Sequence, residues 1–216
     1  MKEKQKASPV RLMAEIGIIA ALGFVIDELQ SAISRGLFVN GGSIGFAMVA
    51  VIIMAYRRGF LPALATGFIM SLLDTATGPY ILPGTWFQAA AQVALDYVLA
   101  YPVVALAGLF KPAFDNSQTR GGKAAWLIVG CLVGGFAKFA VHYAAGAIFW
   151  ADPNISPFAW DLSWMNPYLY VFIYNIAYMG PCIVLSTLIA MLIFWRAPSL
   201  YQDPSALYRG LKESKS

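Results

Sequence analysis

Long apolar segments separated by short polar loops are the feature that most limits how this chain can fold. We place six of them at residues 11–33, 43–56, 60–78, 86–110, 124–150 and 168–195. A helix of about 20 apolar residues is long enough to cross the hydrocarbon core of a bilayer. In that core the backbone N–H and C=O groups must bond to one another, which a helix achieves within its own segment. The sequence therefore predicts an all-α membrane protein, a bundle of six transmembrane helices.

The composition agrees with this class and excludes an ordinary soluble domain. Hydrophobic residues make up 59% of the chain and charged residues 12%, whereas soluble domains average about 25% charged residues. No stretch is long or polar enough for a second domain. We expect a basic cytoplasmic tail at residues 1–10, the membrane domain at 11–196 and a cytoplasmic C-terminal tail at 197–216.

The distribution of basic residues predicts how the helices are oriented. If the N-terminus lies inside, all of the 15 lysines and arginines except Arg35 and Lys138 fall in cytoplasmic loops or tails. They are Lys2, Lys4, Lys6, Arg11, Arg57, Arg58, Lys111, Arg120, Lys123, Arg196, Arg209, Lys212 and Lys215. Such an excess on one side follows the positive-inside rule, so both termini are expected in the cytoplasm. The basic residues form no nucleic-acid reading element, and we expect membrane lipid rather than nucleic acid around the chain.

Motifs for catalysis, metal binding and nucleotide hydrolysis are missing from the sequence. It contains no P-loop and no HExxH pattern, and its single histidine and two cysteines, Cys131 and Cys182, make a zinc site improbable. We therefore expect no catalytic residue, no cofactor and no metal. An intramembrane enzyme is a remote alternative, and a purely structural membrane scaffold is another.

Polar residues inside the apolar segments are the candidates for function, because an ionisable group in lipid is costly. In the outer half of the predicted bundle or in its outer loops lie Asp27, Glu28, Asp74, Asp96, Lys138, His142 and Asn175. Many buried polar groups indicate a polar cavity inside the bundle.

The stretch KFAVHYAAGAIFW places Lys138 and His142 on one helical face, four residues apart, and Trp150 lies roughly along that face. His142 has two interpretations. It is either a buried histidine that bonds to a backbone carbonyl or part of a pocket wall, with Trp150 beside it.

Asp96 also has two interpretations. A lone carboxylate in an apolar helix either pairs with a cation, here Lys138, or contacts a cationic or aminated ligand. The aromatic residues Trp86, Tyr97 and Tyr101 lie near it in the sequence and offer cation–π contacts to such a ligand. Further along the chain, Asn175 carries a buried amide that requires hydrogen-bond partners.

Gly17 and Ala21 form a small-xxx-small pair in the first apolar segment. Such pairs let two helix backbones approach closely. The pair either packs inside the bundle or forms a docking face for another membrane protein.

Several stretches, taken in order, resemble a known family. RLMAEIGIIAALGFVID, AYRRG, LDYVLAYPVVALAGLF, KFAVHYAAGAIFW and YVFIYNIAYMGP are similar to the thiamine-specific S components of energy-coupling factor (ECF) transporters. The resemblance runs from about Arg11 to Arg196. Its most specific motifs are the histidine with a tryptophan eight residues later and the tyrosine with an asparagine five residues later.

The resemblance implies a six-helix bundle in the bacterial plasma membrane with an outward-facing pocket. The pocket binds thiamine, which is delivered with a transmembrane coupling subunit and two cytoplasmic ATPases. Matched residue by residue, the expected substrate-binding positions are Asp96, Tyr97, His142, Trp150, Tyr170 and Asn175. Lys138 and Trp86 are expected to support the pocket, and Gly17 and Ala21 to dock the partner.

Two departures from the family pattern bear on the ligand. The family has glutamate where this chain has Asp96, and it has tryptophans where the stretches GLFVNGGS and GFIMSLLDTATGP contain none. Thiamine is therefore the first expected ligand. Another aminated heterocycle, such as a hydroxymethylpyrimidine precursor of thiamine, is the alternative.

Overall fold

The structure is a computed structural model that describes residues 8–34, 37–38, 41–79, 81–151 and 163–203. Seven of the basic residues used above to predict the orientation lie outside the described residues: Lys2, Lys4, Lys6, Arg35, Arg209, Lys212 and Lys215.

All regular secondary structure in the described residues is helical. The α-helices are α1 (Pro9–Ser34), α2 (Met48–Arg58), α3 (Phe60–Ala76), α4 (Trp86–Val93), α5 (Lys111–Asn116), α6 (Arg120–Phe149) and α7 (Pro167–Arg196). Three further elements are the π-helix η1 (Ala94–Val98) and the 3₁₀-helices η2 (Pro102–Phe110) and η3 (Pro198–Tyr201). The all-α prediction is confirmed for this part of the chain.

Four helical stretches are long and apolar enough to cross a membrane: Pro9–Ser34, Trp86–Asn116, Arg120–Phe149 and Pro167–Arg196. The 17 residues of α3 and the 11 residues of α2 fall short of the about 20 residues that a full span requires. All six predicted segments contain a helix at nearly the predicted position. The count of six transmembrane helices stays a prediction.

The segment predicted at residues 86–110 is not one regular helix. It runs through α4, the π-helix η1, a short turn and the 3₁₀-helix η2. Pro102 begins η2 and lacks the N–H that a continuous α-helix would use, so the regular hydrogen-bond ladder stops there. The π-helix carries Asp96 and Tyr97, and single π-helical turns often occur at functional sites.

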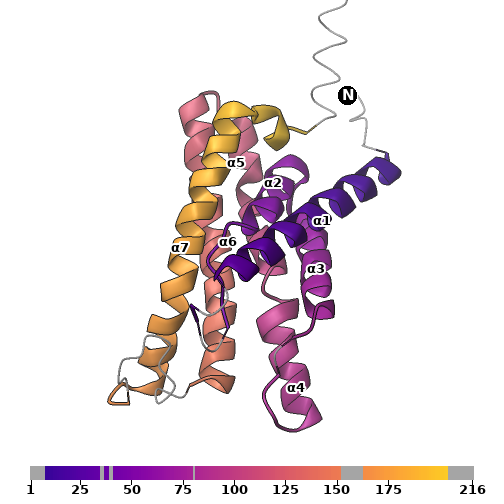
Figure 1. The fold of residues 1–216 in the computed structure, drawn as a ribbon. Helices are drawn as coiled ribbons and strands as arrows, with labels where there is room; N and C mark the ends of the chain where they lie inside the picture. The colour runs from indigo at the N-terminus through magenta and orange to yellow at the C-terminus, as the bar shows by residue number, and fades with distance from the viewer. Residues whose placement is uncertain (1–7, 35–36, 39–40, 80, 152–162, 204–216) are drawn as a thin grey trace, which may run out of the picture.

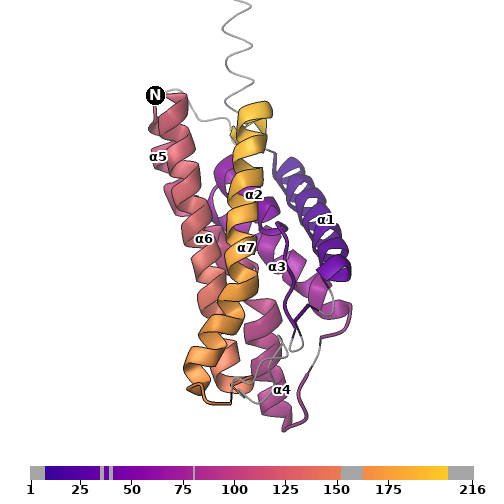
Figure 2. The same cartoon turned by 60° about the vertical axis from the view of Figure 1, so that its left-hand side comes forward.

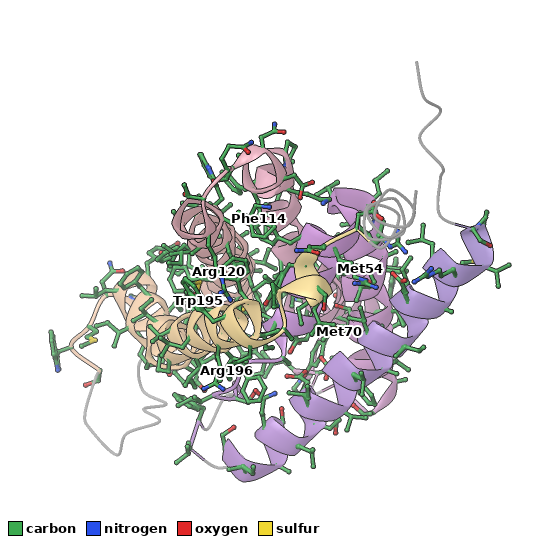
Figure 3. The ribbon with its side chains drawn as sticks, turned by 90° about the horizontal axis from the view of Figure 1, so that it is seen from above. Met54, Met70, Phe114, Arg120, Trp195 and Arg196 are labelled. Carbon is green, nitrogen blue, oxygen red and sulfur yellow. The ribbon has the colours of Figure 1, made fainter. Side chains whose placement is uncertain are left out.

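The main helices form two groups, α6 with α7 and α1 with α2 and α3. α6 and α7 run side by side along the length of the molecule, whereas α1 is inclined to them and packs on α2 and α3 (Figures 1 and 2). Viewed from above, α1 lies along one edge of the bundle (Figure 3). α2 is short and almost entirely buried, because it contacts α1, α3, η2 and α7.

The basic residues near the helix ends gather at one end of the molecule. Arg58 forms ion pairs with Glu15 at 2.8 Å and with Asp203 at 3.1 Å, which join the end of α2 to α1 and to the residues after η3. Arg120, at the start of α6, lies 4.2 Å from the ring of Trp195 near the end of α7 and donates to its carbonyl oxygen (Figure 3). This end contains the beginning of α6 and the end of α7, as the positive-inside pattern requires for a cytoplasmic face.

Residues 197–203 do not form a loose extension of α7. η3 folds back so that the Tyr201 ring is fully buried, and its hydroxyl donates to the Ala190 carbonyl at 2.9 Å. The tail expected at residues 197–216 therefore begins with a packed turn. Residues 204–216 lie outside the described part of the chain.

Candidate functional site

A cavity of about 430 Å³ lies between the two groups of helices. Its walls come from α1, α3, η1, α6, α7 and the segment between α1 and α2. The volume lies within the range of about 300–1,000 Å³ that is typical of small-molecule pockets. All six residues that we expected to bind substrate line it: Asp96, Tyr97, His142, Trp150, Tyr170 and Asn175.

The α6 wall is built on residues spaced by one helical turn. Lys138, His142 and Gly146 follow one another at intervals of four residues, and all three line the cavity. A Cβ atom at Gly146 would lie 2.6 Å from Val171 Cγ1 and 3.0 Å from Asn175 Nδ2. Glycine at this position therefore lets α7 approach α6 and brings Asn175 to the same wall as His142.

The α7 wall combines aromatic rings with one buried amide. Asn175 is 5% exposed; its Nδ2 donates to the Val171 carbonyl at 2.9 Å, and its Oδ1 accepts from the Tyr178 hydroxyl at 2.6 Å. The Tyr178 ring also packs edge-on against His142, with 6.0 Å between the ring centroids. These contacts fix the Asn175 amide, and the bond to Val171 uses only one of its two N–H groups.

Asp96 is held by two residues of the surrounding helices. The Trp150 Nε1–H donates to Asp96 Oδ2 at 3.0 Å, and the Gln92 side chain also hydrogen-bonds to this carboxylate. Gln92, which is 1% exposed, further accepts from the Leu82 N–H at 3.0 Å. Gln92 was not predicted as a site residue, although it precedes Asp96 by four residues and so lies on the same helical face.

The salt bridge considered between Asp96 and Lys138 is absent from the described residues. Instead, the Lys138 ammonium lies 3.6 Å from the centroid of the Tyr101 ring, a cation–π arrangement. Lys138 does line the cavity, and its role as a supporting residue stays a prediction.

Trp86 requires a correction. Its side chain is 82% exposed at the start of α4, and it is not among the residues that line the cavity. The physical reason is its position along the segment. Trp86 is the first residue of α4, directly after the capping residue Thr85, whereas the lining residues of this segment begin about three helical turns later, at Asp96 in η1.

Two carboxylates that were noted only as buried polar residues also line the cavity. Asp27 comes from α1 and Asp74 from α3. Tyr101, which was expected to offer a cation–π contact, also lines the cavity, as do Tyr174 and Tyr178, which were not assigned to the site. The polar character of these residues inside apolar helices was the available signal, but their common location depends on how three separate helices pack.

Gly17 and Ala21 lie on the exposed face of α1. A Cβ atom at Gly17 would meet no other atom within 4 Å. By contrast, a Cβ atom at Gly23 on the opposite face would lie 2.7 Å from Ala50 Cβ. Packing inside the bundle, one of the two interpretations of the Gly17–Ala21 pair, is therefore wrong.

Comparison with known proteins gives one consistent family. A family model described as thiamine transporter protein matches residues 13–202. The chain is similar to the thiamine transporter ThiT of Bacillus subtilis strain 168, with 27% identity over 151 residues, which cover 67% of this chain and 73% of the relative. ThiT of Lacticaseibacillus paracasei is 26% identical over 149 residues, which cover 68% of this chain and 71% of the relative.

A solved structure of ThiT from Listeria monocytogenes matches the fold with a TM-score of 0.71 and 25% sequence identity. The match covers 89% of this chain and 98% of the solved chain.

Proposed function

Since the chain belongs to the family of thiamine transporter proteins, we propose that it is the thiamine-binding S component of an ECF-type transporter. Membership of this family makes it a multi-pass protein of the cell membrane and not an enzyme. The observation that carries the proposal is the cavity of about 430 Å³ in which the six residues matched to the family converge. The proposed orientation places both termini in the cytoplasm and opens the cavity outward.

Each residue of the cavity has a proposed role toward thiamine. Asp96, held by Trp150 and Gln92, accepts from the amino group of the aminopyrimidine ring. Asn175 offers its second N–H to the edge of the same ring. His142 and Trp150 form walls against which the flat rings of the ligand stack.

Tyr97 and Tyr170 complete the lining from η1 and α7. Their phenol rings combine an apolar face with one hydroxyl group, which suits a ligand that carries both heterocyclic rings and polar substituents.

Transport requires partners in this proposal. The chain captures thiamine outside and delivers it with a transmembrane coupling subunit and two cytoplasmic ATPases. Support comes from the exposed face of α1, where Gly17 and Ala21 leave room for a second helix to approach closely.

Titration of the purified protein in detergent tests the proposal. We expect heat and a quench of tryptophan fluorescence at micromolar thiamine, without ATP or sodium, because Trp150 lines the cavity. A hydroxymethylpyrimidine compound, titrated in parallel, tests the alternative ligand. If neither heat nor a quench occurs with thiamine, the substrate assignment is wrong; if only the pyrimidine binds, the alternative replaces it.

A further inference from the structure

The cavity contains a second group of acidic residues besides Asp96. Asp27 on α1 and Asp74 on α3 both line it and are only half-buried. Tyr101 and Lys138 line the same cavity, where the Lys138 ammonium lies 3.6 Å from the centroid of the Tyr101 ring. Three helices and the turn before η2 thus bring these side chains together, although they are far apart in the sequence.

The charges that line the cavity do not balance. Its described lining includes the carboxylates of Asp27, Asp74 and Asp96, one lysine, Lys138, and one histidine, His142. Within the described residues no ion pair of 4.0 Å or less joins Lys138 to any of these carboxylates. The Lys138 ammonium faces the Tyr101 ring instead. The excess of carboxylates over lysines in the lining favours a ligand that brings positive charge.

The two acidic groups have different neighbours. Asp96 accepts hydrogen bonds from Trp150 and Gln92, which suits a carboxylate that is fixed to read one hydrogen-bond donor. Asp27 and Asp74 line the same cavity as Tyr101, on two helices, α1 and α3, that pack on each other. Two like charges held together in a low-dielectric site are repulsive until a cation lies between or beside them. Asp27 and Asp74 are therefore suited to compensate a delocalised positive charge on a ligand, rather than to accept a hydrogen bond from one specific donor.

We propose that Asp27 and Asp74 are specificity-determining residues that select a ligand with a fixed positive charge and hold its cationic ring. The inference rests on the proposed function, in which the ligand is thiamine and the cation is its thiazolium ring. Two groups of carboxylates then recognise different parts of the ligand. Asp96 accepts a hydrogen bond from the amino group, and Asp27 and Asp74 compensate the positive charge of the ring. The same carboxylates repel the phosphate of a phosphorylated ligand.

A pair of ligands with the same shape and different charge tests this division. The neutral thiophene isostere of thiamine keeps the aminopyrimidine and the side chain but lacks the positive ring. We expect the wild-type protein to bind thiamine roughly ten- to a hundredfold more tightly than the isostere. The reason is that the attraction between opposite charges in a partly buried site lowers a dissociation constant by about this factor. This comparison needs no variant.

The variants Asp27→Asn and Asp74→Asn keep the side-chain size and remove the charge. Each is expected to weaken thiamine binding by about tenfold and to leave the affinity for the neutral isostere nearly unchanged. The matched control is Asp96→Asn, which is expected to weaken both ligands to a similar degree. Binding of thiamine monophosphate, relative to thiamine, is expected to improve in the Asp27 and Asp74 variants only.

The outcomes separate this inference from the proposed function. If the wild-type protein binds thiamine but does not distinguish it from the isostere, or if the Asp27 and Asp74 variants weaken both ligands equally, the charge-selecting role is wrong and the proposed function stands. If the wild-type protein binds neither compound, the proposed function is wrong and the inference fails with it.

Discussion

At the scale of single residues, Asn175 shows how a polar side chain is made compatible with an apolar helix. Its amide bonds to the carbonyl one turn earlier on α7 and to the Tyr178 hydroxyl one turn later. These bonds satisfy the amide oxygen and one of the two N–H groups. The arrangement leaves the other N–H for a ligand, and Asn175 is one of the residues that the family resemblance assigned to binding.

We predict that Asn175→Ala weakens thiamine binding by about 1–3 kcal/mol, the cost of leaving a buried partner without its hydrogen bond. Isothermal titration of both proteins measures the difference. The control is Tyr178→Phe, which removes only the hydroxyl that donates to Asn175 Oδ1, and a smaller loss is expected from it. An unchanged dissociation constant for Asn175→Ala would make the residue a packing residue only.

At the scale of elements, α1 has two faces with different functions. One face packs on α2 and α3, and Gly23 on that face touches the neighbouring helix so closely that no side chain fits. The other face exposes Gly17 and Ala21 together with large apolar residues such as Ile18 and Leu22. In a membrane this face contacts lipid or a partner helix.

We predict that Gly17→Leu and Ala21→Trp leave thiamine binding by the isolated protein intact but sharply reduce uptake by cells that contain the coupling subunit and ATPases. The reason is that a bulky side chain prevents the close backbone approach that a small residue permits. Affinity and uptake are measured side by side.

The matched control for these variants is Gly23→Leu on the buried face of α1. A Cβ atom there already lies 2.7 Å from Ala50 Cβ and from the end of Met70, so this variant should lose folding, binding and uptake together. Parallel loss of binding and uptake in the Gly17 and Ala21 variants would contradict the docking role.

The cluster of Arg58, Glu15 and Asp203 joins three elements at the basic end. Two nitrogens of Arg58 donate to Glu15, at 2.8 and 2.9 Å, and a third bonds to Asp203. Because the Arg58 side chain is 5% exposed and that of Glu15 is 16% exposed, water replaces these bonds poorly.

We predict that Arg58→Ala lowers the free energy of unfolding by about 1–3 kcal/mol, since it removes the pair with Asp203 and leaves Glu15 with the longer pairs to Arg57 at 3.2 Å and Arg11 at 3.3 Å. The thermal midpoint in detergent reports the change. For comparison, Lys111→Ala breaks the pair with Asp115, which is 47% exposed, and should cost less than about 1 kcal/mol. Equal effects of the two variants would show that the Arg58 cluster is an ordinary surface ion pair.

At the scale of the whole molecule, the described basic residues near helix ends lie at one end and the α4 start lies at the other (Figure 1). The turn between α5 and α6 belongs to the basic end, and the segment between α3 and α4 to the opposite end. The positive-inside rule therefore predicts the first in the cytoplasm and the second outside.

We predict that a membrane-impermeant maleimide added to intact cells labels Pro83→Cys and does not label Gln118→Cys. Both positions are exposed, whereas the native cysteines Cys131 and Cys182 are buried and contribute little background. Permeabilised cells are the control, in which both variants should react. The reverse pattern in intact cells would mean that the membrane orientation is opposite.

The sequence by itself determined the class of protein, the positions of the helices and the expected orientation, because these depend on local properties. Apolar length and basic flanks act within one segment and can be read along the chain. Residues four positions apart share one face of a helix, so the pairing of Lys138 with His142 and of Gln92 with Asp96 also follows from the sequence of a single segment. The resemblance, read residue by residue, added six positions that the structure brings to one cavity.

Only the tertiary structure decided which polar side chains meet. Trp150 rather than Lys138 bonds to Asp96, across 54 positions of sequence. Asp96 lies in a π-helix where the fourth segment is interrupted. Asp27 and Asp74 line one cavity because α1 packs on α3, and Trp86, the first residue of α4, is exposed. The physical reason is that apolar surfaces of helices pack in many registers with similar burial, so side-chain pairing across helices follows from shape complementarity of the whole bundle, which no single segment contains.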